Sequence, residues 1–360
     1  MNPPKRVLFA SLSAGGGHVR AAEALLEACK QKYPEVEAHH LDLASSCGWL
    51  TKQITTSSYE KIAKHVPTIY GELYRQFNRD QSTKLIYQLA KILKIDLRRA
   101  TKQVKEINPD LVICTNFLAP AMLSHALGDT PFDMTLTDYD FNRVFVSPNT
   151  RRLYAPTEEI KNKLIAYGQT AFYTGIPIHP IFKETKNIEE IKRNLNLDFN
   201  EPVILSLSGG SGFADYTWAL KNCLEAHPRA NFIAVSGRGN PRLFKKLSNL
   251  ADKYNNFHPI EYTNKIHELM AAADVIITKP GGLTTTEALT MKKPLLLVSP
   301  IPGNEDANVT FVETNNYGLY VFDLETLAKK ISDVLAGKIK FAEPLMPKDA
   351  AGDILEKAFT

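Results

Sequence analysis

The sequence has few of the features that mark secreted, membrane-spanning or zinc-binding proteins. Its four cysteines form no C-x-x-C pair and have no histidine at zinc-ligand spacing. We therefore expect reduced thiols and a cytosolic protein. The longest apolar run, from 111 to 123, is interrupted by Thr115, Asn116 and Pro120 and is shorter than the ~18 residues that span a bilayer. Any membrane contact is expected to be peripheral.

Positive charge is in small excess, because the chain has 43 basic and 39 acidic residues. A net charge of +4 does not by itself indicate nucleic acid or an anionic membrane as a partner. The excess is uneven, however: residues 49–107 carry 12 basic and 5 acidic side chains. Within this segment Leu85, Leu89, Ile92 and Leu93 follow helical spacing. The pattern suits a helix on an anionic surface, and equally a solvated helix packed on its own domain.

Short β-rich apolar runs alternate with segments of helical period along the 360 residues. This pattern predicts an α/β protein with parallel sheets and two domains. The predicted strands are 6–13, 35–43, 110–116, 134–138, 152–157, 203–208, 231–237, 258–262, 274–279, 295–299 and 318–322. We expect a first Rossmann-like domain at 1–174 with a basic helical insert at about 49–107, and a second at 175–345. A C-terminal helix at 346–360 is expected to pack back on the first domain.

The first strand leads into a glycine loop, Gly15, Gly16 and Gly17, that precedes a helix. Glycines let a backbone approach a ligand closely, and a helix start offers N–H groups to an anion. The loop is not G-x-G-x-x-G, so a dinucleotide site is only weakly indicated. His18 stands at the helix start, where the helix dipole favours a neutral imidazole that can accept a proton. The same position also suits a histidine that only caps or packs.

Two further turns in the second half suit a nucleotide. The loop of Gly209, Gly210, Ser211 and Gly212 fits a phosphate or a simple tight turn. After the strand at 274–279, a helix begins with glycines and hydroxyl side chains. The backbone amides at its start suit a phosphate, and its carboxylate suits helix capping or a ribose. These residues are Gly281, Gly282, Leu283, Thr284, Thr285 and Glu287. A polar cluster that includes Glu305 and Asp306 suits sugar hydroxyls, or an exposed acidic turn.

Taken together, these segments resemble the GT-B glycosyltransferases of family 28, in the branch of monogalactosyldiacylglycerol synthases and processive diacylglycerol glucosyltransferases. The N-acetylglucosaminyltransferase of peptidoglycan lipid intermediates is a more distant match. The matching segments run in family order over almost the whole chain: SAGGGHVRAAEAL (13–25), TDYDFNRVFVSP (137–148), TGIPIHPIF (174–182), the 208–212 loop, SGRGN (236–240), ELMAAADVIITKPGGLTTTEAL (268–289) and PIPGNEDANVTFV (300–312).

The resemblance implies two doubly wound parallel-sheet domains that face a central cleft, with the acceptor in the first and the nucleotide sugar in the second. It implies that His18 deprotonates the acceptor hydroxyl, with Asp138 as a second candidate base or as the carboxylate that orients His18. Gly15, Gly16, Gly17 and Asn142 fall on the acceptor side. The implied donor contacts are Gly209, Gly210, Ser211, Gly212, Gly237, Arg238, Gly281, Gly282, Leu283, Thr284, Thr285, Glu287 at the ribose, and Glu305 and Asp306 at the sugar.

Two departures from the family pattern concern the acceptor side. Asn142 stands where relatives commonly carry a histidine, and Arg152 stands where they tend to carry an aspartate. The acceptor is therefore the least transferable part of the resemblance. Asp138 and Asp140 read D-x-D, a metal-binding pattern of another glycosyltransferase fold, but they lie in the wrong half to meet the donor diphosphate. We expect no metal and no cofactor, with the UDP-sugar as co-substrate.

We thus expect an inverting hexosyltransferase that acts on diacylglycerol or a glycolipid, peripheral on the cytoplasmic face of the membrane. The basic segment at 49–107 would meet anionic lipid, and nucleic acid is not an expected partner. Several alternatives remain open. They are an N-acetylglucosamine transferase for a polyprenyl-linked or lipopolysaccharide-type acceptor, a UDP-sugar epimerase, a nicotinamide oxidoreductase with Asp42 on a ribose, and an inactive lipid-binding relative.

Overall fold

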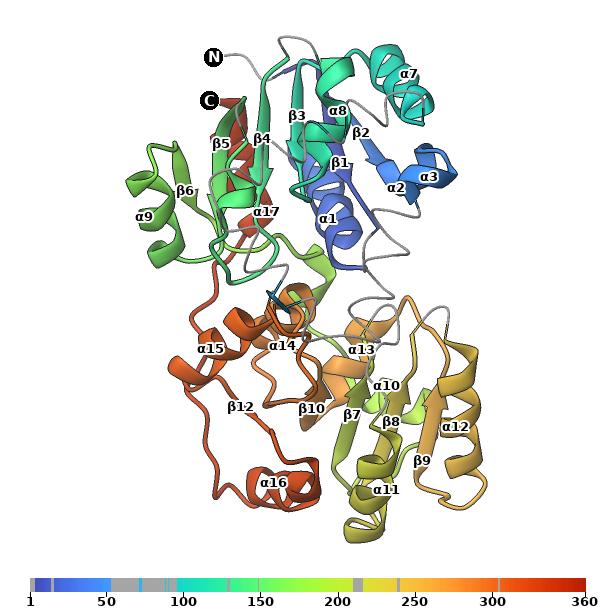
Figure 1. Cartoon of the computed structure of the whole chain (residues 1–360). Coiled ribbons are helices and arrows are strands. Elements are labelled where there is room, and N and C mark those ends of the chain that lie inside the picture. Colours follow the sequence, from blue (N-terminus) through green and yellow to red (C-terminus); the bar gives the residue numbers. More distant parts are fainter. Residues whose placement is uncertain are drawn as a thin grey trace. The chain divides into compact units, whose positions relative to one another are not determined.

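The computed structural model describes residues 4–360 except 14–15, 53–70, 73–87, 89, 91–95, 128–129, 148, 210–215, 238–239 and 304. The chain divides into two compact units (Figure 1). The first comprises Met1–Pro180, Ile301–Ala307 and Pro347–Thr360, and the second comprises Ile181–Pro300 and Asn308–Met346. The division differs from the sequence-based one at residues 175–180 and 301–307, which group with the first unit.

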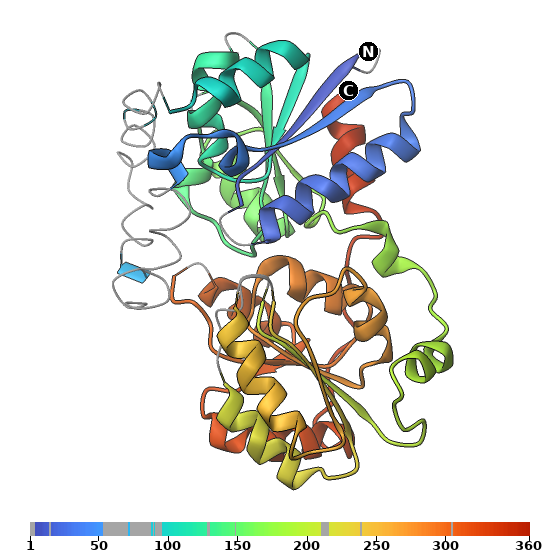
Figure 2. The same ribbon diagram turned by 90° about the vertical axis from the view of Figure 1, so that its right-hand side faces the viewer.

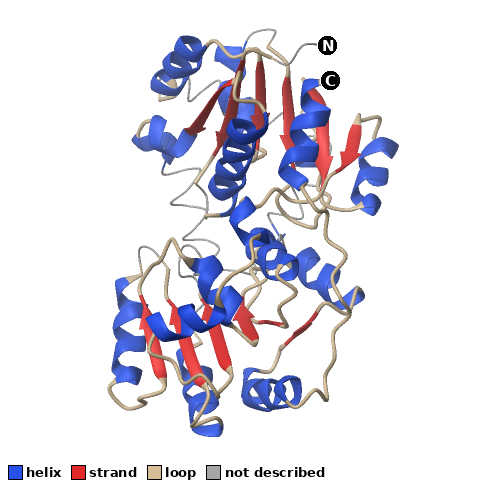
Figure 3. Cartoon of the chain, turned by 180° about the vertical axis from the view of Figure 1, so that it is seen from behind, coloured by secondary structure: helices blue, strands red, loops and turns tan. Residues whose placement is uncertain are grey.

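The first unit is built on a six-stranded parallel sheet in the order β2-β1-β3-β4-β5-β6. Its strands are β1 (Arg6–Ser11), β2 (Glu37–Asp42), β3 (Leu111–Cys114), β4 (Phe132–Thr135), β5 (Thr150–Ala155) and β6 (Ala171–Tyr173). Its helices are α1 (Gly17–Lys32), α2 (Leu43–Ser46), α3 (Trp49–Lys52), α7 (Arg98–Ile107), α8 (Ala119–Leu127), α9 (Glu158–Ala166), α17 (Ala350–Phe359) and the 3-10 helix η3 (Arg143–Phe145), with η4 (Pro180–Lys183) at the junction of the units. Figure 3 shows helices on both faces of this sheet.

Alternation along β1 explains how the sheet is covered. Val7 and Phe9 point to one face and pack with residues of α1 and α17. Leu8 and Ala10 point to the other face and pack with residues of α7 and α8. Because successive side chains of a strand point to opposite faces, a strand covered on both sides is a continuous apolar run. The sequence shows such a run here, and this is why the strand could be predicted.

The C-terminal helix α17 belongs to the first unit and lies beside α1 on one face of its sheet (Figure 2). Ile354 and Leu355 of α17 share a buried cluster with Ala22 and Leu25 of α1. The amphipathic spacing of α17 therefore buries its apolar side against the sheet-covering layer of this unit.

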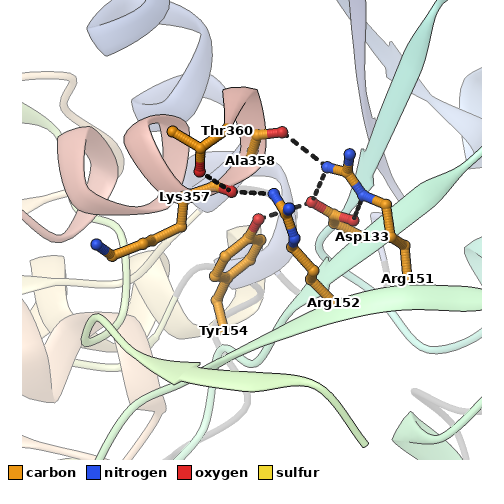
Figure 4. Close-up of polar contacts among 7 residues, drawn as sticks. All are labelled: Asp133, Arg151, Arg152, Tyr154, Lys357, Ala358 and Thr360. Carbon is orange, nitrogen blue, oxygen red and sulfur yellow. Dashed lines mark hydrogen bonds and ion pairs between the residues drawn. The ribbon is translucent and has the colours of Figure 1, made fainter. Parts of the chain in front are cut away.

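Two arginines of β5 hold the carboxyl end of α17 (Figure 4). Arg151 Nη2 donates to the carbonyl of Ala358 at 2.7 Å, and Arg152 Nη1 donates to the carbonyl of Lys357. Cations at a helix C-terminus bind carbonyl groups that have no partner within the helix and complement the helix dipole. Arg152, which departs from the family pattern, thus contacts the C-terminal helix.

Arg151 is in turn oriented by a buried carboxylate. Asp133 of β4 is fully buried and accepts two hydrogen bonds from Arg151, each 2.8 Å long. It also accepts one from the hydroxyl of Tyr154 at 2.6 Å (Figure 4). A buried charge is tolerated when a counter-charge and hydrogen bonds satisfy its oxygens. We call Asp133, Arg151 and Tyr154 the β4–β5 ion cluster. Through Arg151 this cluster is hydrogen-bonded to the end of α17.

The second unit has a six-stranded parallel sheet in the order β12-β11-β10-β7-β8-β9. Its strands are β7 (Val203–Leu207), β8 (Asn231–Val235), β9 (Phe257–Ile260), β10 (Val275–Thr278), β11 (Leu295–Leu297) and β12 (Gly318–Tyr320). Its helices are α10 (Ile188–Asn194), α11 (Thr217–Ala226), α12 (Pro241–Ala251), α13 (Ile266–Ala272), α14 (Gly282–Thr290), α15 (Asp306–Thr314), α16 (Leu327–Leu335) and the 3-10 helix η5 (Leu324–Thr326), with α15 beginning at the junction of the units.

In both sheets the strand that comes first along the chain lies inside the sheet, and later strands are added on both sides of it. The predicted doubly wound α/β fold is therefore confirmed. Each of the eleven predicted strands overlaps a strand of the structure. The strand that was missed is β6, which has three residues and lies at a sheet edge. Its apolar run is only Ala171 to Tyr173, between two threonines, whereas that of the equally short edge strand β12 continues through Val321 and Phe322 and was recognised.

Most of the basic segment lies outside the described residues, including Leu85, Leu89, Ile92 and Leu93. Of its described parts, α7 buries Ala100 and Val104 in its own domain and exposes Arg98, Arg99, Lys102 and Lys105. Among the helices that the structure describes, none is both long and apolar enough to cross a membrane.

Candidate active site

In the first sheet the strand order reverses between the parallel neighbours β1 and β3: β2 lies on one side of β1, and β3 to β6 follow on the other. In doubly wound sheets, ligands bind outside the carboxyl ends of the strands at this switch point. The loop after β1 leads through Gly16, the N-cap of α1, and Gly17, its first residue, to His18. Gly15 lies outside the described residues. Thr115 directly follows β3, so the topology places His18 and Thr115 at the position where a ligand is expected.

The ring of His18 contacts the loops that follow β3 and β4. Its Nδ1 lies 2.6 Å from the carbonyl oxygen of Thr115 and 3.0 Å from Oγ1 of Thr137. The Thr115 hydroxyl donates in return to the His18 carbonyl at 2.8 Å. Because a carbonyl oxygen can only accept, Nδ1 must carry the proton. The neutral ring then has its lone pair on Nε2, which is the atom that can act as a base.

Burial lowers the pKa of His18 below its usual value, while the Asp138 carboxylate and the contact with Thr115 act in the opposite direction. The imidazole is therefore neutral near pH 7. The Asp138 carboxylate thus acts electrostatically on His18, which links the two predicted catalytic residues. Nδ1 is already bound by Thr115 and Thr137, which were not identified from the sequence.

Asn142 has a local structural role. Its side chain is buried, and its Oδ1 accepts a hydrogen bond of 3.1 Å from the N–H of Val144 at the start of η3. Asparagine is among the preferred residues at helix N-caps. Asn142 thus caps a short helix on the loop that carries Asp138, which accounts for an asparagine at this position.

In the second sheet the strand order reverses between the parallel neighbours β7 and β10. Gly209 follows β7 with a φ of +80°, and Gly237 follows β8 with a φ of +84°. These left-handed conformations favour glycine because other residues carry a Cβ that is strained there. The N–H of Gly237 donates to the carbonyl of Glu261 at 3.0 Å. Gly210, Ser211, Gly212 and Arg238 lie outside the described residues.

Helix α14 begins at the same edge of the sheet as Gly209, because it follows β10 after a turn of three residues. Gly281 is its N-cap and brings no side chain to the helix start, where the dipole favours an anion. Gly282, Leu283 and Glu287 are buried, and Thr284 is half-buried. The hydroxyl of Thr285 is buried and has no hydrogen-bond partner among the described residues. A ligand at this helix start could supply a partner for such a hydroxyl.

The two predicted sugar-binding carboxylates differ in environment. Glu305 is buried, and its Oε2 accepts from the N–H of Ile301 at 2.8 Å. Asp306 is exposed, and its Oδ2 accepts from the N–H of Gly303 at 2.8 Å. Both therefore also shape their own loop. Asn308, buried at the start of α15, donates to the carbonyl of Pro280 at 2.8 Å and so anchors α15 to the turn before α14.

Asp42, on which a nicotinamide site would depend, is occupied by its own loop. Its carboxylate accepts from the N–H and the hydroxyl of Ser13, each at 2.9 Å, and from the N–H of Ala44. These bonds cap α2 and fix the loop after β1. The carboxylate therefore supports the loop that leads to His18, and the geometry does not favour it as a ribose ligand.

Solved structures of similar proteins show the fold. A UDP-GlcNAc 2-epimerase from Neisseria meningitidis, bound to UDP-GlcNAc, has a TM-score of 0.60 at 15% identity, with 98% of each chain covered. MurG from Acinetobacter baumannii has a TM-score of 0.55 at 15% identity, with 99% of each chain covered. Identities this low show a shared architecture alone, so the likeness to an epimerase does not extend to its reaction.

Sequence comparisons are more specific. Residues 18–178 match the model of monogalactosyldiacylglycerol (MGDG) synthase, and residues 203–357 match the glycosyltransferase family 28 C-terminal domain. A processive diacylglycerol beta-glucosyltransferase of Bacillus subtilis is 29% identical over 93% of this chain and 88% of its own length. One from Staphylococcus epidermidis is 27% identical over 96% of this chain and 92% of its own length. With an N-terminal domain of the MGDG synthase type and the family's C-terminal domain, the chain belongs to glycosyltransferase family 28.

Proposed function

We propose that the protein transfers a hexose from a UDP-sugar to the hydroxyl of a lipid, diacylglycerol or a glycolipid, with inversion at the anomeric carbon. The observation that carries the proposal is the neutral His18 ring, whose Nδ1–H is bound by Thr115 and whose Nε2 holds the lone pair. The curated relatives, named processive diacylglycerol beta-glucosyltransferases, support diacylglycerol as the acceptor.

In the proposed reaction, the acceptor oxygen attacks the anomeric carbon while Nε2 of His18 takes the hydroxyl proton. The bond between the anomeric carbon and the β-phosphate oxygen breaks, and UDP leaves with the electron pair. The positive end of α14 stabilises the charge that develops on the diphosphate. Thr115 and Thr137 keep the ring of His18 in the tautomer that the proton transfer requires.

The experiment combines a panel of UDP-sugars with vesicles that contain diacylglycerol, and it measures UDP release and the lipid product. We expect UDP release that depends on the lipid, together with a hexosyl-diacylglycerol of inverted configuration. Product formed only from UDP-N-acetylglucosamine and a polyprenyl acceptor would favour that alternative. Isomerisation of a UDP-sugar without any acceptor would show an epimerase instead.

We also propose that α3 and α7 bring the first unit to an anionic membrane surface. Trp49 and Leu50 of α3 are 73% and 47% exposed. The helices are linked because Asp96, just before α7, accepts from the N–H of Thr51 at 2.5 Å and offers its carbonyl to Gly48. The polar side of α7 exposes four cations, Arg98, Arg99, Lys102 and Lys105. Exposed aromatic and basic side chains on two helices that are linked in this way suit a lipid interface.

Sedimentation with vesicles tests this surface. At low salt, binding is expected to vesicles with anionic lipid and to be weaker to purely zwitterionic ones, and salt should reduce it. Trp49→Ala should weaken binding, whereas Trp218→Ala, which removes a 50% exposed tryptophan of the second unit, should not. Failure to sediment with anionic vesicles, or equal effects of the two substitutions, would contradict the proposal.

A further inference from the structure

Lys279 lies directly against the glycine loop of the second sheet. It follows β10, and Gly209 follows the adjacent strand β7, so both stand at the switch point of this sheet. A Cβ on Gly209 would lie 2.6 Å from Cε and 3.1 Å from Cδ of Lys279. The lysine stem thus occupies the space that a side chain at Gly209 would need. Because Nζ is bonded to Cε, the ammonium group lies one bond beyond the atom that approaches Gly209 most closely.

Two other features with affinity for anions occur at the same edge of the sheet. Helix α14 begins three residues after Lys279, with a glycine as its N-cap, and its dipole adds a partial positive charge. Thr285, in the same helix, has a buried hydroxyl without a hydrogen-bond partner among the described residues. A cation, a helix N-terminus and a glycine backbone together suit a diphosphate, which carries several acceptor oxygens and more than one negative charge.

We propose that Lys279 binds the diphosphate of the nucleotide-sugar donor and stabilises it as a leaving group. The inference rests on the proposed function and names the residue that stabilises the negative charge on the departing diphosphate. When the bond between the anomeric carbon and the β-phosphate oxygen breaks, the electron pair stays on that oxygen. An ammonium group already beside it stabilises this charge without rearrangement. A glycine at 209 suits this arrangement, because its φ of +80° favours glycine and because it leaves room for the lysine stem.

Titration calorimetry with UDP and with uridine tests the inference, because uridine lacks the diphosphate. Lys279→Met keeps the length of the stem and removes the charge. It should weaken UDP binding by about tenfold or more and leave uridine binding unchanged. Lys279→Arg should keep most of the UDP affinity. Lys245→Met, at an exposed lysine of α12 in the same unit, is the matched control and should bind UDP like the unchanged protein.

Gly209→Ala provides a second variant that leaves Lys279 in place. Its Cβ would displace the lysine stem, so UDP affinity should fall, and the loss should be smaller when Lys279 is already methionine. The inference is overturned if Lys279→Met binds UDP normally, or loses UDP and uridine in equal proportion. If UDP binding depends on Lys279 but no hexose is transferred, the proposed function fails and this inference stands. Absence of UDP binding by the unchanged protein would overturn both.

Discussion

Nδ1 of His18 lies 2.6 Å from the carbonyl oxygen of Thr115, and this contact joins the start of α1 to the end of β3 at the switch point of the first sheet. The acceptor is a backbone atom, so it stays in place whatever side chain follows β3. Its geometry fixes the proton on Nδ1 and leaves Nε2 basic. The part of this arrangement that substitution can remove is the hydroxyl of Thr137, 3.0 Å from the same nitrogen.

Thr137→Val should lower kcat by roughly 3–10-fold, because one neutral hydrogen bond contributes about 1 kcal/mol. The KM for the UDP-sugar should change little, since Thr137 orients the base and does not touch the donor. Steady-state kinetics check both values. Thr137→Ser restores the hydroxyl and should recover most of the rate. Equal rates for Val and Ser would show that the hydroxyl has no part in positioning His18.

The pH dependence follows from the lowered pKa of His18. A base acts only when unprotonated, so kcat/KM should fall on the acid side with a midpoint below ~6.5, the ordinary histidine value. The Asp138 carboxylate raises this pKa, and Asp138→Asn should therefore move the midpoint to still lower pH. NMR titration of the His18 ring gives the same shift independently of activity. A midpoint that rises in Asp138→Asn would contradict the assigned interaction.

The β4–β5 ion cluster should matter for stability. Asp133→Asn removes the charge that faces Arg151 and weakens the acceptor of Tyr154, and it should lower the free energy of unfolding by about 2–4 kcal/mol. Urea denaturation measures this change. Lys102→Met serves as the comparison because it breaks an exposed ion pair with Glu106, for which a loss below ~1 kcal/mol is expected. Similar losses in the two variants would refute a special role for Asp133.

Metal removal should leave the activity intact, because Lys279 and the start of α14 are proposed to supply the positive charge at the diphosphate. Transfer rates measured after dialysis against EDTA, with and without added Mg²⁺ or Mn²⁺, check this expectation. A rate lost in EDTA and restored by either ion would assign that charge to a metal.

The sequence predicted the two sheets well because parallel strands covered on both faces leave continuous apolar runs, as in β1 and β7. It also singled out His18, at the start of α1, and Asp138, in the loop after β4, as candidate catalytic residues, and this role stays a prediction. It could not identify Thr115 and Thr137 as partners of His18, since they are 97 and 119 residues away in the chain. Their approach depends on the order of strands in the sheet, which local periodicity does not reveal.

Two other residues needed the structure for their local role. Asn142 was interpreted as standing where relatives carry a histidine, and its bond to the N–H of Val144 adds a capping role. Lys279 was treated as the end of a strand. The signal that could have indicated its proposed role is a lysine and a glycine that follow the two strands of a switch point, and recognising that signal requires the strand order.

The most direct test of the central claim is the transfer rate of His18→Ala, measured with the best UDP-sugar and diacylglycerol vesicles alongside UDP affinity by calorimetry. Loss of a general base should reduce kcat by about 10²–10⁴-fold, while UDP affinity stays at the value of the unchanged protein. Turnover that is unaffected by the substitution would contradict the role assigned to His18.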